Sequence, residues 1–411
     1  MMATLDTAFV RAQFPAFSLP SLEGQAFFEN AGGSYPCAQV VDRLHRFYTE
    51  RKVQPYAPYA VSQLAGAEMD QARTRLAAMM GVAREEVSFG PSTSANTYVL
   101  AQAVRQWLRG TDGAVVVTDQ DHEANSGVWR RLADEGIEVR EWKIDPETGH
   151  LDLARLKALL ADGRVRWVAF PHCSNVVAEI NPVQEICALA RAAEAFTCVD
   201  GVSYAPHGLP DVAGLGADVY LFSAYKTYGP HQGIMAIRRE CAEALPAQGH
   251  YFNAGTLYKR HTPAGPDHAQ VAACAGMADY ADALHAHHFA PEVDAAARGR
   301  AVHDLMRAAE VERLAPLLDY LAARNDLRLI GTRDPARRAP TVAVALDRAA
   351  EPVAAALAAH GINAGGGDFY AVRPLGAMGV DLEKGVLRMS FVHYTTAEEV
   401  ERLIAALDAV L

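Results

Sequence analysis

The sequence has no long apolar run and no excess of positive charge. Its 411 residues include no uninterrupted apolar stretch of the roughly 18 residues that a membrane-spanning helix needs. The first residues, MMATLDTAFVRAQFP, contain an early Asp6 and no apolar signal-peptide core, so we expect a soluble, cytoplasmic protein. The formal net charge of -11 argues against a nucleic-acid binder and against binding to anionic membranes, although it allows a small basic pocket.

The sequence is also poor in cysteine and lacks any CxxC pair. Its six cysteines are scattered through mostly apolar surroundings: Cys37, Cys173, Cys187, Cys198, Cys241 and Cys274. This spacing favours reduced core residues over disulfides or zinc ligands, so we predict no metal site.

What the chain does contain is enough apolar sequence for two domains. Half of the residues are hydrophobic, and the length exceeds what one hydrophobic core usually covers. We assign residues 22–268 to a large domain, and residues 1–21 together with 269–411 to a smaller α+β domain. In the smaller domain, alanine-rich helical stretches precede short strands at LRLIG, TVAVALD and VLRMSF, and the sequence ends in a helix.

From about residue 85 to residue 240, short β-branched runs alternate with helical segments. The predicted strands are VSFG, AVVVTD, VRWVAF, AFTCVD, ADVYLFS and GIMAIR, which begin at residues 87, 114, 165, 195, 217 and 233. Segments between them, such as ANTYVLAQAVRQWL, have apolar residues every three or four positions, which is typical of helices. The alternation predicts an α/β fold with a mostly parallel sheet, and ligands bind such sheets beyond the carboxyl ends of the strands.

Polar residues follow the first three of these strands. Ser92, Thr93 and Ser94 stand where a helix begins, and they suit either ordinary N-capping or a phosphate cradle. His122 follows the second strand, where a lone histidine is more often structural than functional. Asn175 follows the third, where the alternative is an Asx turn.

The next two strands end in charged residues. Asp200 directly follows a buried strand, so its carboxylate should face a cation or a strong donor. Ser223 and Lys226 lie in FSAYKTYGPHQG after the fifth strand. Pyridoxal 5'-phosphate (PLP) is held by this combination of groups: hydroxyls at a helix start, a flat histidine, an asparagine, a carboxylate and an amine. If Lys226 were a surface lysine, this ordered set would have no common explanation.

Taken in order, these motifs resemble a known family. The motifs are FFENAGGSYP, GPSTSANT, DQDHEANSGVW, SNVVAEINP, VDGVSYAPHG, FSAYKTYGP and VLRMSFVHYTTAEEV. In this order they resemble the class V aminotransferase superfamily of fold-type I PLP enzymes, especially its cysteine desulfurase and selenocysteine lyase branch. The resemblance covers nearly the whole chain. It implies a fold-type I architecture with a seven-stranded type of sheet, a homodimer, and a small amino acid as substrate.

The resemblance also implies roles for the cofactor-binding candidates. Lys226 matches the Schiff-base lysine and the base for the α-proton, and Asp200 matches the partner of the pyridinium nitrogen. His122 matches the ring-stacking histidine, which can also move protons, and Asn175 the residue near the ring hydroxyl. The phosphate-binding candidates are Ser92, Thr93, Ser94 and Ser223.

Three further residues are expected on the substrate side. Arg388, in VLRMSF, matches the arginine that clamps the substrate carboxylate, a task that suits a bidentate guanidinium. Asn30 and Ala31 lie in FFENAGGSYP, which is similar to the Asp-Asn-Ala-Ala opening of the family.

The chain departs from the family at four positions. Tyr370, in GDFYA, stands where the desulfurases place the cysteine that accepts sulfur. Ser203 replaces a glutamine and Tyr225 replaces the histidine before the lysine, and both keep a hydrogen-bonding group in the cofactor site. Gly265 replaces a threonine in the segment that reaches the phosphate of a neighbouring subunit.

The residues present allow three reactions on the substrate. These are β-elimination of the carbon-sulfur lyase type, transamination and epimerisation, and the same groups serve all three. We favour β-elimination without a persulfide cysteine, with Tyr370 lining the pocket or protonating the leaving group. The alternatives are an aminotransferase or amino-acid epimerase, and a PLP-binding protein without turnover.

Overall fold

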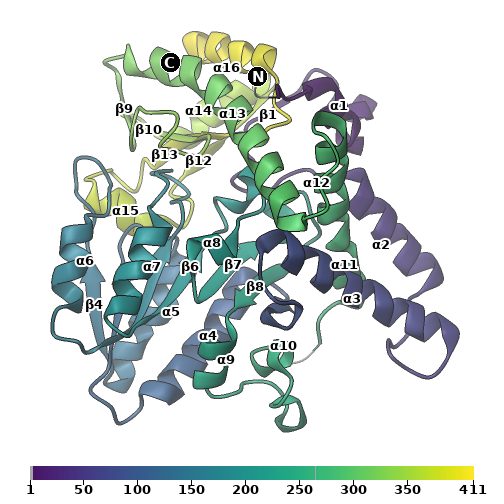
Figure 1. Cartoon of the computed structure of the whole chain (residues 1–411). Coiled ribbons are helices and arrows are strands. Elements are labelled where there is room, and N and C mark those ends of the chain that lie inside the picture. Colours follow the sequence, from purple (N-terminus) through teal and green to yellow (C-terminus); the bar gives the residue numbers. More distant parts are fainter. Residues whose placement is uncertain (1–2, 264) are drawn as a thin grey trace.

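The computed structural model describes residues 3–263 and 265–411, which form two main sheets with separate cores (Figure 1). The larger sheet has seven strands in the order β2-β8-β7-β6-β5-β3-β4. In that order the strands are Val87–Gly90, Gly233–Ile237, Val219–Ser223, Phe196–Asp200, Val165–Pro171, Ala114–Thr118 and Glu138–Trp142. Strand β8 runs opposite to the other six strands, which all run in one direction. The predicted α/β fold with a mostly parallel sheet is therefore confirmed.

The large sheet is buried on both faces, which explains its continuous apolar strands. Alternate residues of β3 enter different cores: Val115 and Val117 pack with α4 and α5, whereas Val116 packs with α6 and α7. These four helices are Thr93–Leu108, Glu123–Arg130, Leu153–Leu160 and Val183–Ala192. Because the helices connect successive parallel strands, the strands' carboxyl ends lie along one edge of the sheet.

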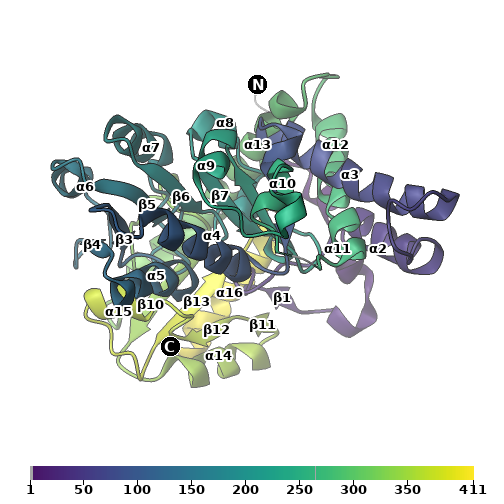
Figure 2. The ribbon, with the colours of Figure 1, turned by 90° about the horizontal axis from the view of Figure 1, so that it is seen from below.

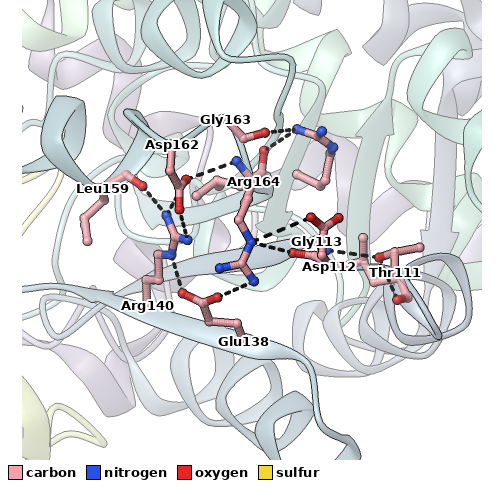
Figure 3. Close-up of polar contacts among 12 residues, drawn as sticks. Thr111, Asp112, Gly113, Glu138, Arg140, Leu159, Asp162, Gly163 and Arg164 are labelled. Carbon is pink, nitrogen blue, oxygen red and sulfur yellow. Dashed lines mark hydrogen bonds and ion pairs between the residues drawn. The ribbon is translucent and has the colours of Figure 1, made fainter.

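The edge strand β4 was not predicted from the sequence. Its sequence, EVREW, has three charged and two apolar residues, and only Trp142 is buried, as suits an edge strand. Figure 3 shows the polar contacts around it: Arg140 pairs with Glu138 at 2.7 Å and with Asp162 at 2.5 Å, and Glu138 also pairs with Arg164 at 2.7 Å. These charges cover an edge that would otherwise be open to another strand.

The smaller sheet is antiparallel, in the order β12-β13-β10-β9. Its strands are Gly365–Gly367, Val386–Ser390, Thr341–Leu346 and Leu327–Leu329. Helices α14 (Ala350–Ala359), α16 (Ala397–Val410) and the second half of α13 (Ala295–Ala322) share its core. The strand β12 was missed by sequence reasoning because a run of three glycines is typical of a loop.

Helices after residue 268 join the core of the large sheet as well as that of the small one. Helices α11 (His268–Ala273) and α12 (Ala275–His288) pack on α2 (Ala38–Glu50) and α3 (Ala60–Met80). The first half of α13 reaches the same core, so this helix connects the two cores. Figure 1 and Figure 2 both show α2 and α3 projecting from the side away from β4.

The remaining elements are short. They are α1 (Thr7–Ala12), α8 (Val212–Leu215), α9 (Arg239–Ala244), α10 (Leu257–Arg260), α15 (Val372–Ala377), and the parallel pair β1 (Ala26–Phe27) and β11 (Ile362–Asn363). Among the described residues, no helix has the length and apolar character to cross a membrane.

Candidate active site

Two adjoining cavities lie where the strands of the large sheet end. The smaller, of about 130 Å³, is lined by most of the predicted cofactor-binding residues: Ser92, Thr93, Ser94, His122, Asn175, Asp200, Ser203, Ser223, Tyr225 and Lys226. The larger, of about 570 Å³, is lined by Ala31, Tyr370 and Arg388 together with several residues of the first set. Lys226 lines both cavities, so its amine stands where they meet.

The start of α4 supplies the hydroxyl groups at one end of the smaller cavity. Ser92 is the N-cap of α4, and its Oγ accepts a hydrogen bond from the N–H of Ala95 at 3.1 Å. The hydroxyls of Thr93 and Ser223 lie 2.8 Å apart. A Cβ on Gly233 of β8 would lie 2.4 Å from the backbone carbon of Ser92, so glycine is needed there. Capping and cavity lining thus occur at the same helix start, and its amides and hydroxyls suit a phosphate.

His122 is the N-cap of α5 and is neutral at physiological pH. Its Nδ1 accepts a hydrogen bond from the N–H of Ala124 at 3.1 Å, which leaves the proton on Nε2. Burial, together with the charges of Lys226 and Arg388, lowers the pKa of His122 to about 4. At neutral pH this ring can therefore donate a hydrogen bond from Nε2 and cannot take up a second proton readily.

Asp200 and Lys226 form the charged part of the site. Asp200 is buried at the end of β6, and its Oδ1 accepts a hydrogen bond from the N–H of Val202 at 2.9 Å. Burial raises the pKa of Asp200, and the charge of Lys226 opposes that rise. Burial and the charge of Arg388 lower the pKa of Lys226 to about 8, although Asp200 and Glu29 act in the other direction. The amine thus loses its proton far more easily than an exposed lysine.

Asn175 connects the cofactor cavity to the loop that follows β12. Its Nδ2 donates to the carbonyl oxygen of Phe369 at 2.9 Å. Its Oδ1 is buried and has no hydrogen-bond partner in the part of the chain that the structure describes. A buried amide oxygen without a donor suits a ligand hydroxyl, which agrees with the predicted position of Asn175 near the ring hydroxyl of the cofactor.

Tyr370 lies at the mouth of the larger cavity. Its side chain is 72% exposed, and its ring centroid is 5.4 Å from that of His122. The backbone of the loop is held in place, because the N–H of Glu123 donates to the carbonyl oxygen of Tyr370 at 2.9 Å. Phe369 and Tyr370 both have positive φ, at 52° and 57°, a conformation that costs energy in residues other than glycine.

Arg388 reaches the larger cavity, but its guanidinium is already paired. Its Nη2 lies 2.5 Å from Oε1 of Glu29, and its Cζ lies 3.7 Å from the ring centroid of Phe369. Sequence reasoning missed Glu29 and Phe369. The acidic residue in FFENAGGSYP was a visible signal for Glu29, whereas only the folded loop places Phe369 on Arg388.

The structure places Asn30 and Gly265 outside the two cavities. The Nδ2 of Asn30 donates to the carbonyl oxygen of Ser390 at 3.2 Å, and its Oδ1 accepts from Tyr394, so its side chain fastens the chain to β13. Gly265 lines a separate cavity of about 340 Å³ with residues such as Tyr56. Within one chain, Gly265 therefore does not contribute to the site of Lys226.

A histidine that sequence reasoning missed also lines the smaller cavity. His231 stacks on Tyr225, with ring centroids 4.9 Å apart. Tyr225 stands where the resemblance expects a histidine, so the fold brings an imidazole beside this position from six residues further along the loop. The signal in the sequence was the GPHQG turn itself.

All six cysteines are buried and free. Of these, Cys173 lines the smaller cavity, where burial raises the pKa of its thiol to about 12. Its Sγ lies 3.2 Å from the carbonyl oxygen of Ala178. A thiol in this state is a poor nucleophile, because the thiolate is the reactive form. No cluster of potential metal ligands occurs within residues 3–263 and 265–411.

The donors and acceptors around the cavities fit PLP. Five kinds of group face one cavity: a helix start with hydroxyl groups, a neutral flat ring, a carboxylate, an amide oxygen with no partner among the described residues, and an amine with a lowered pKa. These are the groups that bind PLP.

Comparisons with known proteins agree with this fit. The pattern of the family described as Aminotransferase class-V matches residues 26–403. The chain is 31% identical to the "Aminotransferase-like protein FGM3" of Gibberella zeae over 98% of each chain. It is 29% identical to a cysteine desulfurase of Serratia proteamaculans, over 98% of this chain and 97% of that one. The apo structure of a cysteine desulfurase from Thermococcus onnurineus superposes with a TM-score of 0.84 at 22% identity, over 99% of this chain and 98% of that one, which establishes a shared fold. The predicted fold-type I architecture is thereby confirmed.

Proposed function

This chain belongs to the class V aminotransferase family and is a PLP-dependent enzyme, and we propose that it eliminates a substituent from the β-carbon of a small amino acid without a persulfide cysteine. The observation that carries this proposal is the loop after β12. Tyr370 stands there beside His122, where the resemblance places the sulfur-accepting cysteine. A phenol has no sulfur to accept, and the buried cysteines lie in other elements.

Lys226 is the base in this proposal. When bound, PLP withdraws electrons from the α-carbon of an amino acid and so makes its proton removable. Lys226 has a pKa of about 8, which gives a useful fraction of free amine near neutral pH. Asp200 lines the same cavity as Lys226, and its carboxylate would hold the pyridinium nitrogen. Thr93 and Ser94 at the start of α4, and Ser223 at the end of β7, would hold the phosphate.

His122 and Tyr370 both line the larger cavity, with ring centroids 5.4 Å apart, and this scheme assigns them to the leaving group. His122 donates from Nε2 and is not a base at neutral pH, because its pKa is lowered to about 4. Tyr370 keeps an ordinary exposed hydroxyl at the mouth of the cavity. Tyr370 therefore supplies the proton that the departing group takes up.

An aminotransferase is the second candidate, and one observation favours it. The relative from Gibberella zeae, at 31% identity over 98% of the chain, is named an aminotransferase-like protein. Transamination uses the same Lys226 as β-elimination. It differs in the atom to which the proton taken from the α-carbon is returned.

We also propose a homodimer in the cytoplasm. Exposed aromatic residues on and near α2, α3 and α10 support the dimer: Tyr48, Tyr56, Tyr59, Tyr251 and Phe252. Gly265 lies outside the site of its own chain, which is consistent with the expected contact to the phosphate of a partner.

Three measurements test the proposed function. The purified protein loaded with PLP should be yellow, and Lys226→Ala should lose the visible band; a colourless wild type would overturn the role of Lys226. Incubation with a panel of amino acids should release pyruvate and ammonia, whereas a keto acid formed only with an amino acceptor would favour transamination. Tyr370→Phe should lower turnover about 100-fold if the phenol protonates the leaving group. Full turnover in Tyr370→Phe would remove that role.

A further inference from the structure

The carboxylate clamp is closed in this structure. Nη2 of Arg388 is held by Glu29 at 2.5 Å, and its Nη1 lies 3.4 Å from the carbonyl oxygen of Asn175. The ring of Phe369 covers the guanidinium at 3.7 Å. A carboxylate binds a guanidinium along its edge, so a substrate carboxylate that enters the larger cavity competes with Glu29 for Arg388, whereas Phe369 covers only a face of the guanidinium.

Glu29 lines the larger cavity together with Arg388. Oε2 of Glu29 is shielded from solvent and has no hydrogen-bond partner among the residues described. Oε2 and the ring of Phe369 both lie against Gly365: a Cβ there would be 2.9 Å from each. A ligand that binds Arg388 in this cavity is thus close to a carboxylate oxygen that lacks a donor.

The pair also changes the charge of the clamp. An arginine alone would present one positive charge to a substrate carboxylate, whereas Arg388 and Glu29 together are neutral. An apolar amino acid would gain little from such a clamp. A side chain that brings a hydrogen-bond donor would satisfy Oε2 of Glu29 while its carboxylate binds Arg388.

We propose that Glu29 is a specificity-determining residue, which selects amino acids whose side chain carries a hydroxyl or ammonium group over apolar side chains of equal size. The inference rests on the proposed function, because it requires an amino-acid substrate. The larger cavity, of about 570 Å³, lies in the range of sites that hold molecules larger than alanine or cysteine.

The test uses three amino acids of nearly equal size that differ at one atom. These are L-norvaline, with a terminal methyl group, L-homoserine, with a hydroxyl, and L-2,4-diaminobutyrate, with an ammonium. Their binding to the PLP-loaded enzyme is followed by the change in its visible spectrum. We expect the two donor-bearing probes to bind at least about tenfold more tightly than norvaline. Equal or tighter binding of norvaline by the wild type overturns the inference and needs no variant.

The variant Glu29→Gln tests whether Glu29 causes the difference in affinity between the three amino acids. In this variant the preference for diaminobutyrate should fall at least about fivefold, and norvaline should bind more tightly because Arg388 keeps its full charge. Glu123→Gln is the matched control, because Glu123 lines the same cavity and pairs with Arg373 instead; its selectivity should equal that of the wild type. If Glu29→Gln changes all three affinities by one factor, Glu29 merely competes for Arg388 and the inference is wrong. A loaded wild type whose spectrum responds to no amino acid would instead refute the proposed function.

Discussion

Replacing Lys226 by methionine should stabilise the protein in its cofactor-free form. The amine of Lys226 is largely enclosed, and burial lowers its pKa from the ordinary value of 10.5 to about 8. Near pH 7 the folded protein must therefore hold a charged amine in a place that disfavours charge. Methionine has a similar length and no charge, so it removes that cost.

The size of the effect follows from the pKa. A fall from 10.5 to about 8 corresponds to about 3 kcal/mol, at roughly 1.4 kcal/mol for each pH unit. The pKa of about 8 already contains the attraction between Lys226 and Asp200, and imperfect packing of methionine at this site opposes part of the gain. We therefore expect Lys226→Met to raise the free energy of unfolding by about 1–3 kcal/mol at pH 7.

The pH dependence gives the sign of the effect. Between pH 8 and 10.5 the unfolded chain binds a proton at Lys226 that the folded chain does not. The stability of the wild type should therefore rise with pH across this window, relative to the variant. The advantage of Lys226→Met should be full below about pH 8 and nearly absent above about pH 10.5.

Urea denaturation of the cofactor-free wild type and variant, at one protein concentration, measures the free energy of unfolding at pH 7 and at pH 10.5. Lys143→Met is the control, because the side chain of Lys143 is 67% exposed; its stability should stay within about 0.5 kcal/mol of the wild type. A Lys226→Met protein that is no more stable than the wild type at pH 7, or whose advantage persists at high pH, would refute the reasoning.

Three other substitutions test separate parts of the structure. Gly233→Ala places a Cβ 2.4 Å from the backbone of Ser92, so PLP affinity, measured by spectral titration, should fall at least about tenfold; Gly376→Ala, which meets no atom within 4 Å, should bind PLP normally. Asp200→Asn removes a charge that raises the pKa of Lys226; turnover should fall about 100-fold or more, and the pH profile should shift to lower pH, whereas an unchanged profile would contradict the coupling. Asp162→Asn removes the partner of Arg140 at 2.5 Å; the melting temperature should fall slightly in low salt and match the wild type in about 1 M NaCl, because salt screens exposed pairs.

The sequence was sufficient to predict the elements that carry the site. Six of the seven strands of the large sheet start within two residues of their predicted starts, because a sheet buried on both faces has continuous apolar strands. The seventh, β4, lies at an edge and has three charged residues among its five, so no apolar run marks it. The glycines of β12 similarly hide a strand whose pairing with β13 is visible only in the folded chain.

The candidate site divides in the same way. Residues such as Lys226 and Asp200 lie at or just after the ends of apolar strands. Parallel strands bring their carboxyl ends to one edge of the sheet for any conformation of the loops. The tertiary structure alone decided the state of Arg388, because its partners Glu29 and Phe369 come from segments far from it in the sequence. It also decided that the side chain of Asn30 fastens the chain to β13. Apolar patterning is local and so can be read from the sequence, whereas the pairing of one buried charge with another depends on how distant segments pack.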